Sequence, residues 1–233
     1  MDSNANFADS LVAANKDLWG AMAAHPWVKA LADGTLPEPA LIAWAQQCRL
    51  YCMQEHQALL ILRALNPSEQ LGTLLDKTLD RLLVKLEDDT VREPRELEET
   101  LKSLNAPLVD EAWPVCLGYG SFVITCARDG LLEGLAAIYA CERAYLDTWT
   151  AVLPSVPPGS RWHDWVNNWT QDLFRETVDG LGRCVNECAG TPSDEIRVRM
   201  NRAFRGVALF ELAFWEMSWK QQGWPSLPVK EEQ

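Results

Sequence analysis

Two glutamates that lie in strongly apolar stretches are the residues with the clearest potential for chemistry. Glu142 lies within residues 135–145 and Glu211 within residues 207–215, and apolar residues make up most of both stretches. Because burying a charge is costly unless it is paired or neutralised, a lone acid in such a stretch indicates a function or a buried ion pair. Tyr145 and Phe214 each follow their acid by three residues, so each acid is expected beside an aromatic ring.

If the two helices that carry these acids face each other, two carboxylates enter one aromatic pocket. Such a pair can act as an acid and a base on a flat ring, because different surroundings separate the two pKa values. The structural alternative pairs Glu142 with Arg143 or Arg128, and Glu211 with Arg205, as buried ion pairs. Composition alone leaves both interpretations open.

Aromatic residues elsewhere are weaker candidates. Tyr119 lies between Gly118 and Gly120, which permits either close helix packing or the approach of a ligand. Trp169 and Phe174 lie in one short segment, and such residues belong more often to a core than to a cofactor site.

The metal-ligating residue types do not fall into a ligand pattern. There are seven cysteines, an odd number, and two pairs of them are four residues apart. Structural zinc sites use short cysteine spacers, often with histidines, and only His25, His56 and His163 are present. A di-iron or haem site also needs histidines, and carboxylates at helical spacing. We therefore expect no metal and no cofactor, and reduced cysteines that pack as small buried side chains.

Composition and charge restrict the partners. The chain has 233 residues, 48% of them hydrophobic, with 33 acidic and 21 basic side chains and a formal charge of −12. An acidic protein repels phosphate backbones and anionic lipid, so nucleic acid and membrane surfaces are not expected partners. No apolar run is long enough to cross a bilayer, and the N-terminal residues lack the pattern of a signal or transit peptide. These features predict a cytoplasmic protein.

Helical periodicity positions the candidate residues. Apolar residues recur at helical spacing almost from end to end, and strand patterns are nearly absent. Short connections favour antiparallel packing in one bundle. The sequence therefore predicts an all-α protein of seven to nine helices, a single domain over residues 1–233 with a loose tail after about residue 224. The main expected helices cover residues 8–24, 40–66, 68–86, 109–128, 131–153 and 195–222, with short helices ending near 33 and 105. Residues 162–188 are expected to form one or two helices.

Several motifs follow one another in a recognisable order. They are His25-Pro26-Trp27, Asp33-Gly34-Thr35-Leu36, Trp44-Ala45-Gln46-Gln47, Gly118-Tyr119, and the segments 140–145, 169–174 and 210–217. This succession resembles the TenA/thiaminase II family, which has the haem-oxygenase-like all-helical fold. The resemblance covers nearly the whole chain, and its most specific part is the segment from Phe210 to Met217.

The resemblance implies a hydrolase of pyrimidine salvage in thiamin metabolism. Its substrate would be a small heteroaromatic ring, an aminopyrimidine-type thiamin breakdown product or thiamin itself, attacked by deamination or amide hydrolysis. One branch of the family uses a cysteine on the fifth-helix segment, and another, usually called TenA_E, uses a glutamate. Cys141 matches the first branch except that Ala140 replaces its proline, and Glu142 matches the second. Because adjacent helical residues point about 100° apart, we expect one of them to face the pocket, and we favour Glu142 and the Glu-type subgroup.

The same resemblance assigns further residues to the pocket. It implies that Glu211 is the acid–base carboxylate, and that the ring is bound by Tyr51, Tyr119, Tyr145, Trp169 and Phe214. It also implies a homodimer or homotetramer, for which the eleven tryptophans offer apolar surface.

One position departs from the family pattern. Where the family has Gln-Asp in the long second helix, with the aspartate holding the amidine edge of the pyrimidine, this chain has Gln47-Cys48. A thiol cannot replace a carboxylate that accepts from an amino group. Cys48 is therefore expected to meet a different substrate, and the alternative function is a non-catalytic or altered-specificity protein that binds a small molecule on the same fold.

The sequence predicts opposite effects for the two neighbouring candidates. If Glu142 faces the pocket, Glu142→Gln should lower turnover by about 10²–10⁴, because an amide cannot transfer a proton. Cys141→Ala should then cost only packing, about 1 kcal/mol of stability. Turnover and unfolding of both variants measure the difference, and a nucleophilic Cys141 would reverse the pattern.

Overall fold

All the regular structure in the described residues is helical. The computed structural model describes residues 6–65 and 92–225, and within these ranges it has ten α-helices, one short 3₁₀ helix and no strand. The helices are α1 (Phe7–Ala14), α2 (Lys16–Ala23), α3 (Pro26–Ala32), α4 (Glu38–Ala64), α6 (Arg92–Ser103), α7 (Pro114–Asp129), α8 (Leu131–Val152), η1 (Leu153–Ser155), α9 (Arg161–Asn168), α10 (Asp172–Ala189) and α11 (Asp194–Lys220). The all-α prediction is confirmed.

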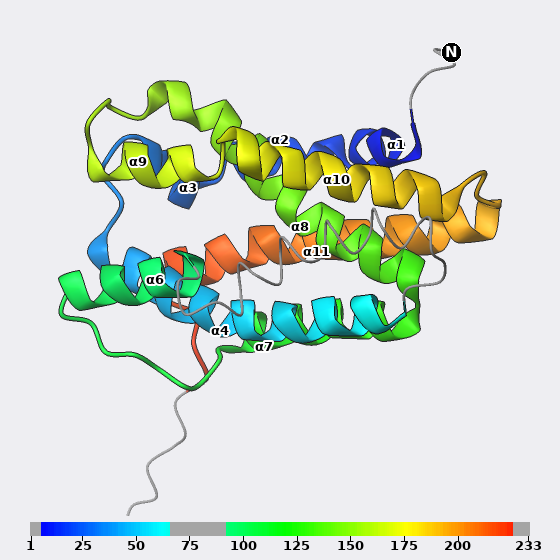
Figure 1. Cartoon of the computed structure of the whole chain (residues 1–233). Helices are drawn as coiled ribbons and strands as arrows, with labels where there is room; N and C mark the ends of the chain where they lie inside the picture. The colour runs from blue at the N-terminus through cyan, green and yellow to red at the C-terminus, as the bar shows by residue number, and fades with distance from the viewer. Residues whose placement is uncertain (1–5, 66–91, 226–233) are drawn as a thin grey trace, which may run out of the picture.

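Helix α8 runs through the middle of the bundle. On one side α1, α2 and α10 form a layer, on the other side lie α4 and α7, and α11 lies between them (Figure 1). α8 crosses from one layer to the other and contacts α11, α10, α7 and α2. Most of its residues are buried, including Leu135 and Trp149. A helix that is apolar on all sides is stable only inside a protein, which explains this position.

The described residues contain more helices than the expected seven to nine, and one predicted helix is divided, because the stretch 8–24 is interrupted at Asn15. The stretch 162–188, expected as one or two helices, forms two, with residues 169–171 between them. The helix expected from residue 109 begins only at Pro114, since Gln46 and Arg49 of α4 bind the carbonyls of Pro107 and Val109 in an extended segment. The expected helix at 68–86 and nearly all of the expected loose tail lie outside the described residues.

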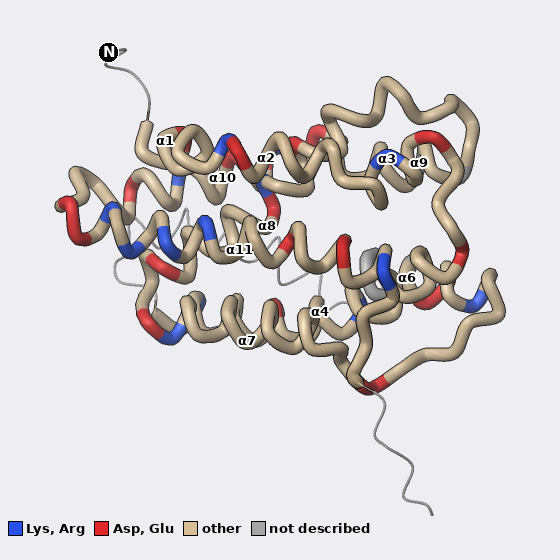
Figure 2. Tube along the Cα trace, turned by 180° about the vertical axis from the view of Figure 1, so that it is seen from behind, with Lys and Arg blue, Asp and Glu red and all other residues tan. Residues whose placement is uncertain are grey.

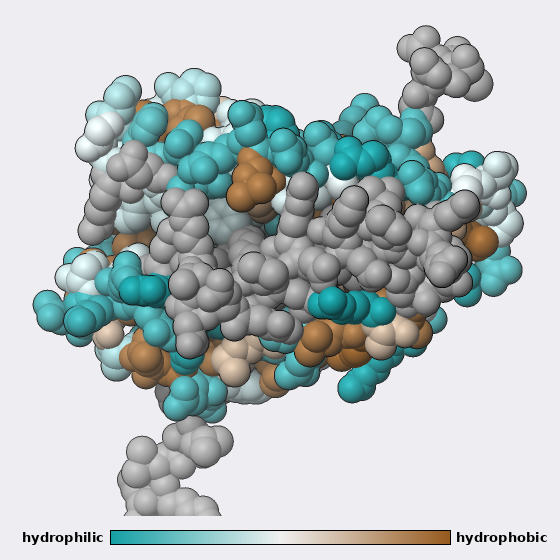
Figure 3. Space-filling model, in the orientation of Figure 1, coloured by the Kyte–Doolittle hydropathy of each residue, from teal (hydrophilic) through white to brown (hydrophobic). Residues whose placement is uncertain are grey.

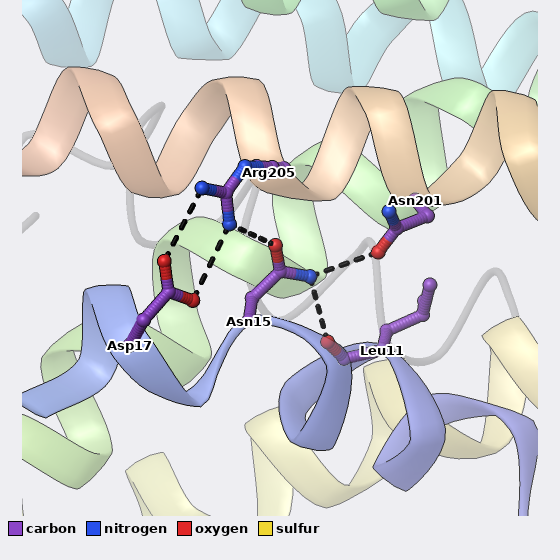
Figure 4. Close-up of polar contacts among 5 residues, drawn as sticks. All are labelled: Leu11, Asn15, Asp17, Asn201 and Arg205. Atoms are coloured by element: carbon purple, nitrogen blue, oxygen red, sulfur yellow. Dashed lines mark hydrogen bonds and ion pairs between the residues drawn. The ribbon is translucent and has the colours of Figure 1, made fainter.

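A buried asparagine fixes the break between α1 and α2 (Figure 4). The Asn15 amide donates to the carbonyl oxygen of Leu11 at 2.8 Å and to Asn201 Oδ1 at 2.9 Å. Its oxygen accepts from Arg205 at 3.1 Å, and the same guanidinium pairs with the exposed Asp17. The polar side chain at the break is therefore hydrogen-bonded to residues of α11, and these bonds connect the N-terminal helices to that helix.

Tryptophan side chains form much of the core. Trp27, Trp44, Trp149 and Trp215 are fully buried. Trp149 contacts Trp27, Trp165 and Trp215 with ring centroids 5.1–6.3 Å apart. These tryptophans are covered within the chain, and the expected interface between subunits stays a prediction.

Basic and acidic residues are distributed differently over the described helices. Basic residues gather on the first half of α11, while acidic residues are spread over most elements (Figure 2). Two of these arginines are engaged within the chain, Arg199 with Glu133 at 3.0 Å and Arg205 with Asp17. The face over α1 and α10 is mainly hydrophilic (Figure 3). No helix in residues 6–65 or 92–225 combines the length and the apolarity needed to cross a bilayer.

Replacing the buried asparagine should destabilise the bundle. Asn15→Ala removes one donor group and one acceptor and leaves Asn201 and the carbonyl of Leu11 with a lost hydrogen bond. We expect a loss of about 2–3 kcal/mol in the free energy of unfolding, measured by urea denaturation.

Asp17→Ala is the matched control, because it removes the exposed partner of the same arginine. Surface ion pairs contribute little, so this variant should unfold close to the wild-type midpoint. An equal loss in the free energy of unfolding of the two variants would show that Arg205, not Asn15, stabilises the break between α1 and α2.

Candidate active site

One pocket lies where α4, α7, α8 and α11 meet the turn after α9. It encloses about 410 Å³ of space between atoms, part of which is open to solvent. The lining includes all nine residues named as site candidates from the sequence. It also includes two others, so that the complete set is Cys48, Tyr51, Cys52, Glu55, Tyr119, Cys141, Glu142, Tyr145, Trp169, Glu211 and Phe214.

Helix α4 supplies four of these residues from one face. Cys48, Tyr51, Cys52 and Glu55 are spaced three and four residues apart, so their side chains point the same way. Gln47, next to Cys48, has another function: its Oε1 accepts from the backbone N–H of Trp113 at 2.6 Å. This bond satisfies a donor at the start of α7 and fixes that helix against α4.

Helix α7 approaches α4 closely at Tyr119. A Cβ atom on Gly120 would lie 1.9 Å from the Gln54 Oε1 and 2.6 Å from its Cβ, so only glycine allows this approach. The Tyr119 ring stacks on Tyr51 with centroids 4.3 Å apart and, in parallel, on Phe210 at 5.4 Å. Of the two sequence interpretations of these glycines, close packing is therefore the one observed at Gly120.

Polar atoms from α4, α7, α8 and α11 meet inside the pocket. The Tyr119 hydroxyl donates to Glu211 Oε1 at 2.6 Å. The Cys141 thiol donates to the same oxygen at 3.5 Å and accepts from the Tyr51 hydroxyl at 3.4 Å. Glu211 is thus placed to receive a proton from the thiol of Cys141.

Cys141 and Glu142 both line the pocket, so the expectation that only one would face it is wrong. Their exposed fractions are 6% and 5%, and one Glu142 oxygen lies within 4.8 Å of the Cys141 sulfur. The pocket wraps around α8 widely enough to meet two neighbouring side chains. Cys141 points toward Tyr51 and Glu211, which lie on α4 and α11.

Two of the three arginines proposed as structural partners, Arg143 and Arg205, pair with other carboxylates. Arg143 Nε lies 2.7 Å from the Asp147 carboxylate, one turn along α8. Arg205 pairs with Asp17 at 3.2 Å, outside the pocket.

Tyr145 and Trp169 form a second aromatic wall. Their rings meet edge to face with centroids 5.2 Å apart, and Trp169 packs in the same way on Phe174. Tyr145 also touches Trp149 and Trp215, so the core tryptophans hold this wall in place. This wall and the group of Tyr51, Tyr119 and Phe214 line the same pocket.

Burial controls the protonation of the thiol and the two phenols. It raises the pKa of Cys141 well above its usual value, and the carboxylates of Glu55, Glu211 and Glu142 raise it further. Burial likewise raises the pKa of the Tyr51 and Tyr119 hydroxyls. These groups are therefore protonated near neutral pH and act as donors to Glu211 and Cys141.

Glu55 is the functional candidate that sequence reasoning missed. It is 7% exposed and lies among polar residues, between Gln54 and His56, so it lacks the isolated-acid signal of Glu142 and Glu211. The available signal was positional, since Glu55 lies three residues after Cys52 and seven after Cys48 on one helix face.

The second half of the chain resembles a known family. The model of the TENA/THI-4/PQQC family matches residues 119–221, which include most of α7 and all of α8 and α11.

Relatives of known name cover nearly the full length of the chain. An aminopyrimidine aminohydrolase of Halalkalibacterium halodurans is 25% identical, over 94% of this chain and 98% of that protein. An aminopyrimidine aminohydrolase of Bacillus subtilis is 24% identical, over 97% of this chain and 94% of the relative.

Solved structures establish the same fold. A TenA homologue from Pyrococcus furiosus superposes with a TM-score of 0.80 at 21% identity, covering 91% of this chain and 99% of that one. A TenA homologue from Pyrococcus horikoshii has a TM-score of 0.78 at 22% identity, covering 93% and 99%. The fold is therefore the haem-oxygenase-like bundle of these proteins.

Cys141 should react slowly with iodoacetamide in the native protein. The thiolate is the reactive form, and a raised pKa keeps it scarce at neutral pH, so alkylation should accelerate as the pH rises from 7 to 9. Glu211→Gln removes one of the charges that raise this pKa and should speed the reaction. Peptide mapping by mass spectrometry measures both rates.

The urea-unfolded protein serves as the control for this labelling, because all seven cysteines are there exposed. Fast labelling of Cys141 in the native protein at pH 7 would contradict the electrostatic description.

Proposed function

We propose that this protein is a TenA-type hydrolase that releases ammonia from an aminopyrimidine related to thiamin. The observation that carries the proposal is the chain of hydrogen bonds from Tyr51 through Cys141 to Glu211 and Tyr119, inside a pocket with two aromatic walls. The match to the TENA/THI-4/PQQC family model and the relatives named aminopyrimidine aminohydrolases support the reaction type.

The first half of the reaction replaces ammonia by sulfur. Glu211 takes the Cys141 proton, and the sulfur forms a bond to the ring carbon that bears the amino group. Glu142, protonated at this stage, gives its proton to the adjacent ring nitrogen as the C=N electron pair moves there. The amino group then leaves as ammonia with the proton from Glu211, and the ring nitrogen returns its proton to Glu142.

The second half consumes water. Glu211 removes a proton from a water molecule, whose oxygen adds to the same carbon while Glu142 again protonates the ring nitrogen. The carbon–sulfur bond breaks, and the sulfur takes back a proton from Glu211. The hydroxyl group on the ring gives its proton to Glu142, which leaves a carbonyl in place of the amine. One water enters and one ammonia leaves.

This assignment uses residues of both family branches. Cys141 takes the role of the cysteine branch, and Glu142 provides a second carboxyl group of the kind used in the glutamate branch. The closeness of the two side chains supports such a joint role. A mechanism without the sulfur would have Glu142 and Glu211 activate water directly.

Substitutions should separate these mechanisms. Glu211→Gln and Glu142→Gln should each lower turnover by about 10²–10⁴, the usual contribution of one acid–base group. Cys141→Ala should be at least as damaging if the sulfur forms a bond to the ring. Ammonia release is measured with thiamin and with 4-amino-2-methylpyrimidines that share its ring.

Glu216→Gln is the matched control on α11, because Glu216 pairs with Lys220 and His25 outside the pocket. It should keep near wild-type turnover. A normal rate in Cys141→Ala, with both glutamine variants inactive, would replace the sulfur mechanism by direct attack of water. Ligand binding without ammonia release from any ring would show a binding protein instead of an enzyme.

A further inference from the structure

Phe210 is an aromatic residue that contacts the site from outside the pocket. It directly precedes Glu211 on α11 and is half-buried, whereas Glu211 is only 2% exposed. The Phe210 ring lies parallel to the ring of Tyr119, with 1° between the two planes and 5.4 Å between the centroids. The proposed reaction assigns no task to Phe210, so this close contact with a pocket residue requires an explanation.

The ring of Tyr119 is stacked between two other rings. Tyr51 of α4 stacks on it with centroids 4.3 Å apart, and Phe210 of α11 stacks on it at 5.4 Å. Because one ring face has room for a single stacked neighbour, Tyr51 and Phe210 cover opposite faces. Tyr119 itself is 1% exposed, so its ring is enclosed by α4, α7 and α11.

Phe122 of α7 supports the ring of Phe210, with centroids 5.5 Å apart. Phe122 lies directly against the backbone of α11, since a Cβ atom on Gly206 would lie 2.3 Å from the Phe122 Cζ atom. A glycine inside a helix is destabilising relative to alanine. The glycine at position 206 therefore admits this aromatic contact at a cost in helix stability, which indicates that the position of Phe210 matters.

The hydroxyl group of Tyr119 also has a defined place. It donates to Glu211 Oε1 at 2.6 Å, the distance of a short hydrogen bond to a carboxylate. The same oxygen accepts from the Cys141 thiol at 3.5 Å. Because one oxygen accepts from both groups, the position of the Tyr119 hydroxyl affects where that oxygen lies relative to the sulfur.

We propose that Phe210 is a positioning residue that acts through Tyr119. Its ring keeps the Tyr119 ring in the plane from which the hydroxyl reaches Glu211, and the resulting bond keeps Glu211 Oε1 beside the Cys141 thiol. Two consecutive residues of α11 thus contact the two ends of one tyrosine, Phe210 at the ring face and Glu211 at the hydroxyl. The proposal rests on the proposed function for the task of Glu211, and it adds how the bundle orients that carboxyl group.

Proton NMR tests the contact without any substrate. A buried hydroxyl proton in a short hydrogen bond gives a separate downfield resonance, which Tyr119→Phe assigns because it removes the proton. Phe210→Leu keeps an apolar side chain but no ring, so it should shift or broaden this resonance. Phe210→Tyr keeps the ring and should leave the resonance in place. An unchanged resonance in Phe210→Leu, or a wild-type spectrum without it, would overturn the proposal.

Leu209→Ala is the matched control on α11. Leu209 precedes Phe210 and is 49% exposed, so its removal should change neither the hydroxyl resonance nor the midpoint of urea denaturation. Urea denaturation of Phe210→Leu checks that this variant is folded. The same shift of the resonance in Leu209→Ala would contradict the assignment to Phe210, because it would reflect a general loosening of the helix.

Turnover separates positioning from packing. Phe210→Leu should lower kcat for an aminopyrimidine about 10-fold, the usual contribution of one hydrogen bond to a charged group, with little change in KM. In a Tyr119→Phe background, Phe210→Leu should lower kcat no further, because there is no hydroxyl left to position. A second 10-fold loss in that background would show that Phe210 acts by another route.

Failure of this proposal and failure of the proposed function give different results. An inactive wild-type protein whose hydroxyl resonance still depends on Phe210 would exclude the reaction but keep the positioning role. An active protein in which Phe210→Leu changes neither the resonance nor kcat would keep the reaction and exclude the role of Phe210.

Discussion

Three carboxyl groups kept out of water are the constraint on which the rest of the structure depends. Glu55, Glu142 and Glu211 are 7%, 5% and 2% exposed. Removing such groups from water costs several kcal/mol each when they are charged, and this cost must be offset by the surrounding packing and hydrogen bonds. The Tyr119 hydroxyl, 2.6 Å from Glu211, is one visible part of that compensation. The buried acids lower the stability of the fold, and ionisable groups in such costly surroundings are common in functional sites.

Helix α8 can hold a buried acid in place because other helices surround it. Its apolar sides pack on α11, α10 and α7, so the backbone that carries Cys141 and Glu142 has little freedom to move. Tyr145 is held by Trp149 and Trp215, which belong to the same buried aromatic network. The unusual number of tryptophans therefore has a structural explanation: the rings fill the space around the helix that presents the thiol and one of the acids.

The sequence predicted which residues line one pocket better than it predicted the helix boundaries. Glu142 and Glu211 were recognisable because each is a lone acid in an apolar helix, and burial of α8 follows from the same pattern. The break at Asn15 was not predictable, since the periodicity continues across it and only Asn201 and Arg205, far along the chain, make the break favourable. Glu55 was hidden for a similar reason, because its neighbours are polar and its burial depends on other helices. The expectation that only one of Cys141 and Glu142 faces the pocket was wrong because it assumed a pocket too narrow to contact two adjacent residues of α8.

Helix α11 comes last among the described helices, and this order has a consequence for synthesis on the ribosome. It brings Glu211 and Phe214 to a pocket whose other walls lie on α4, α7 and α8, up to about 160 residues earlier in the chain. Until α11 emerges, the apolar side of α8 that it covers stays in contact with water. A nascent chain therefore passes through a stage with exposed core surface, when it is open to aggregation or to a chaperone. The lining of the pocket is complete only after residues up to Phe214 have been made.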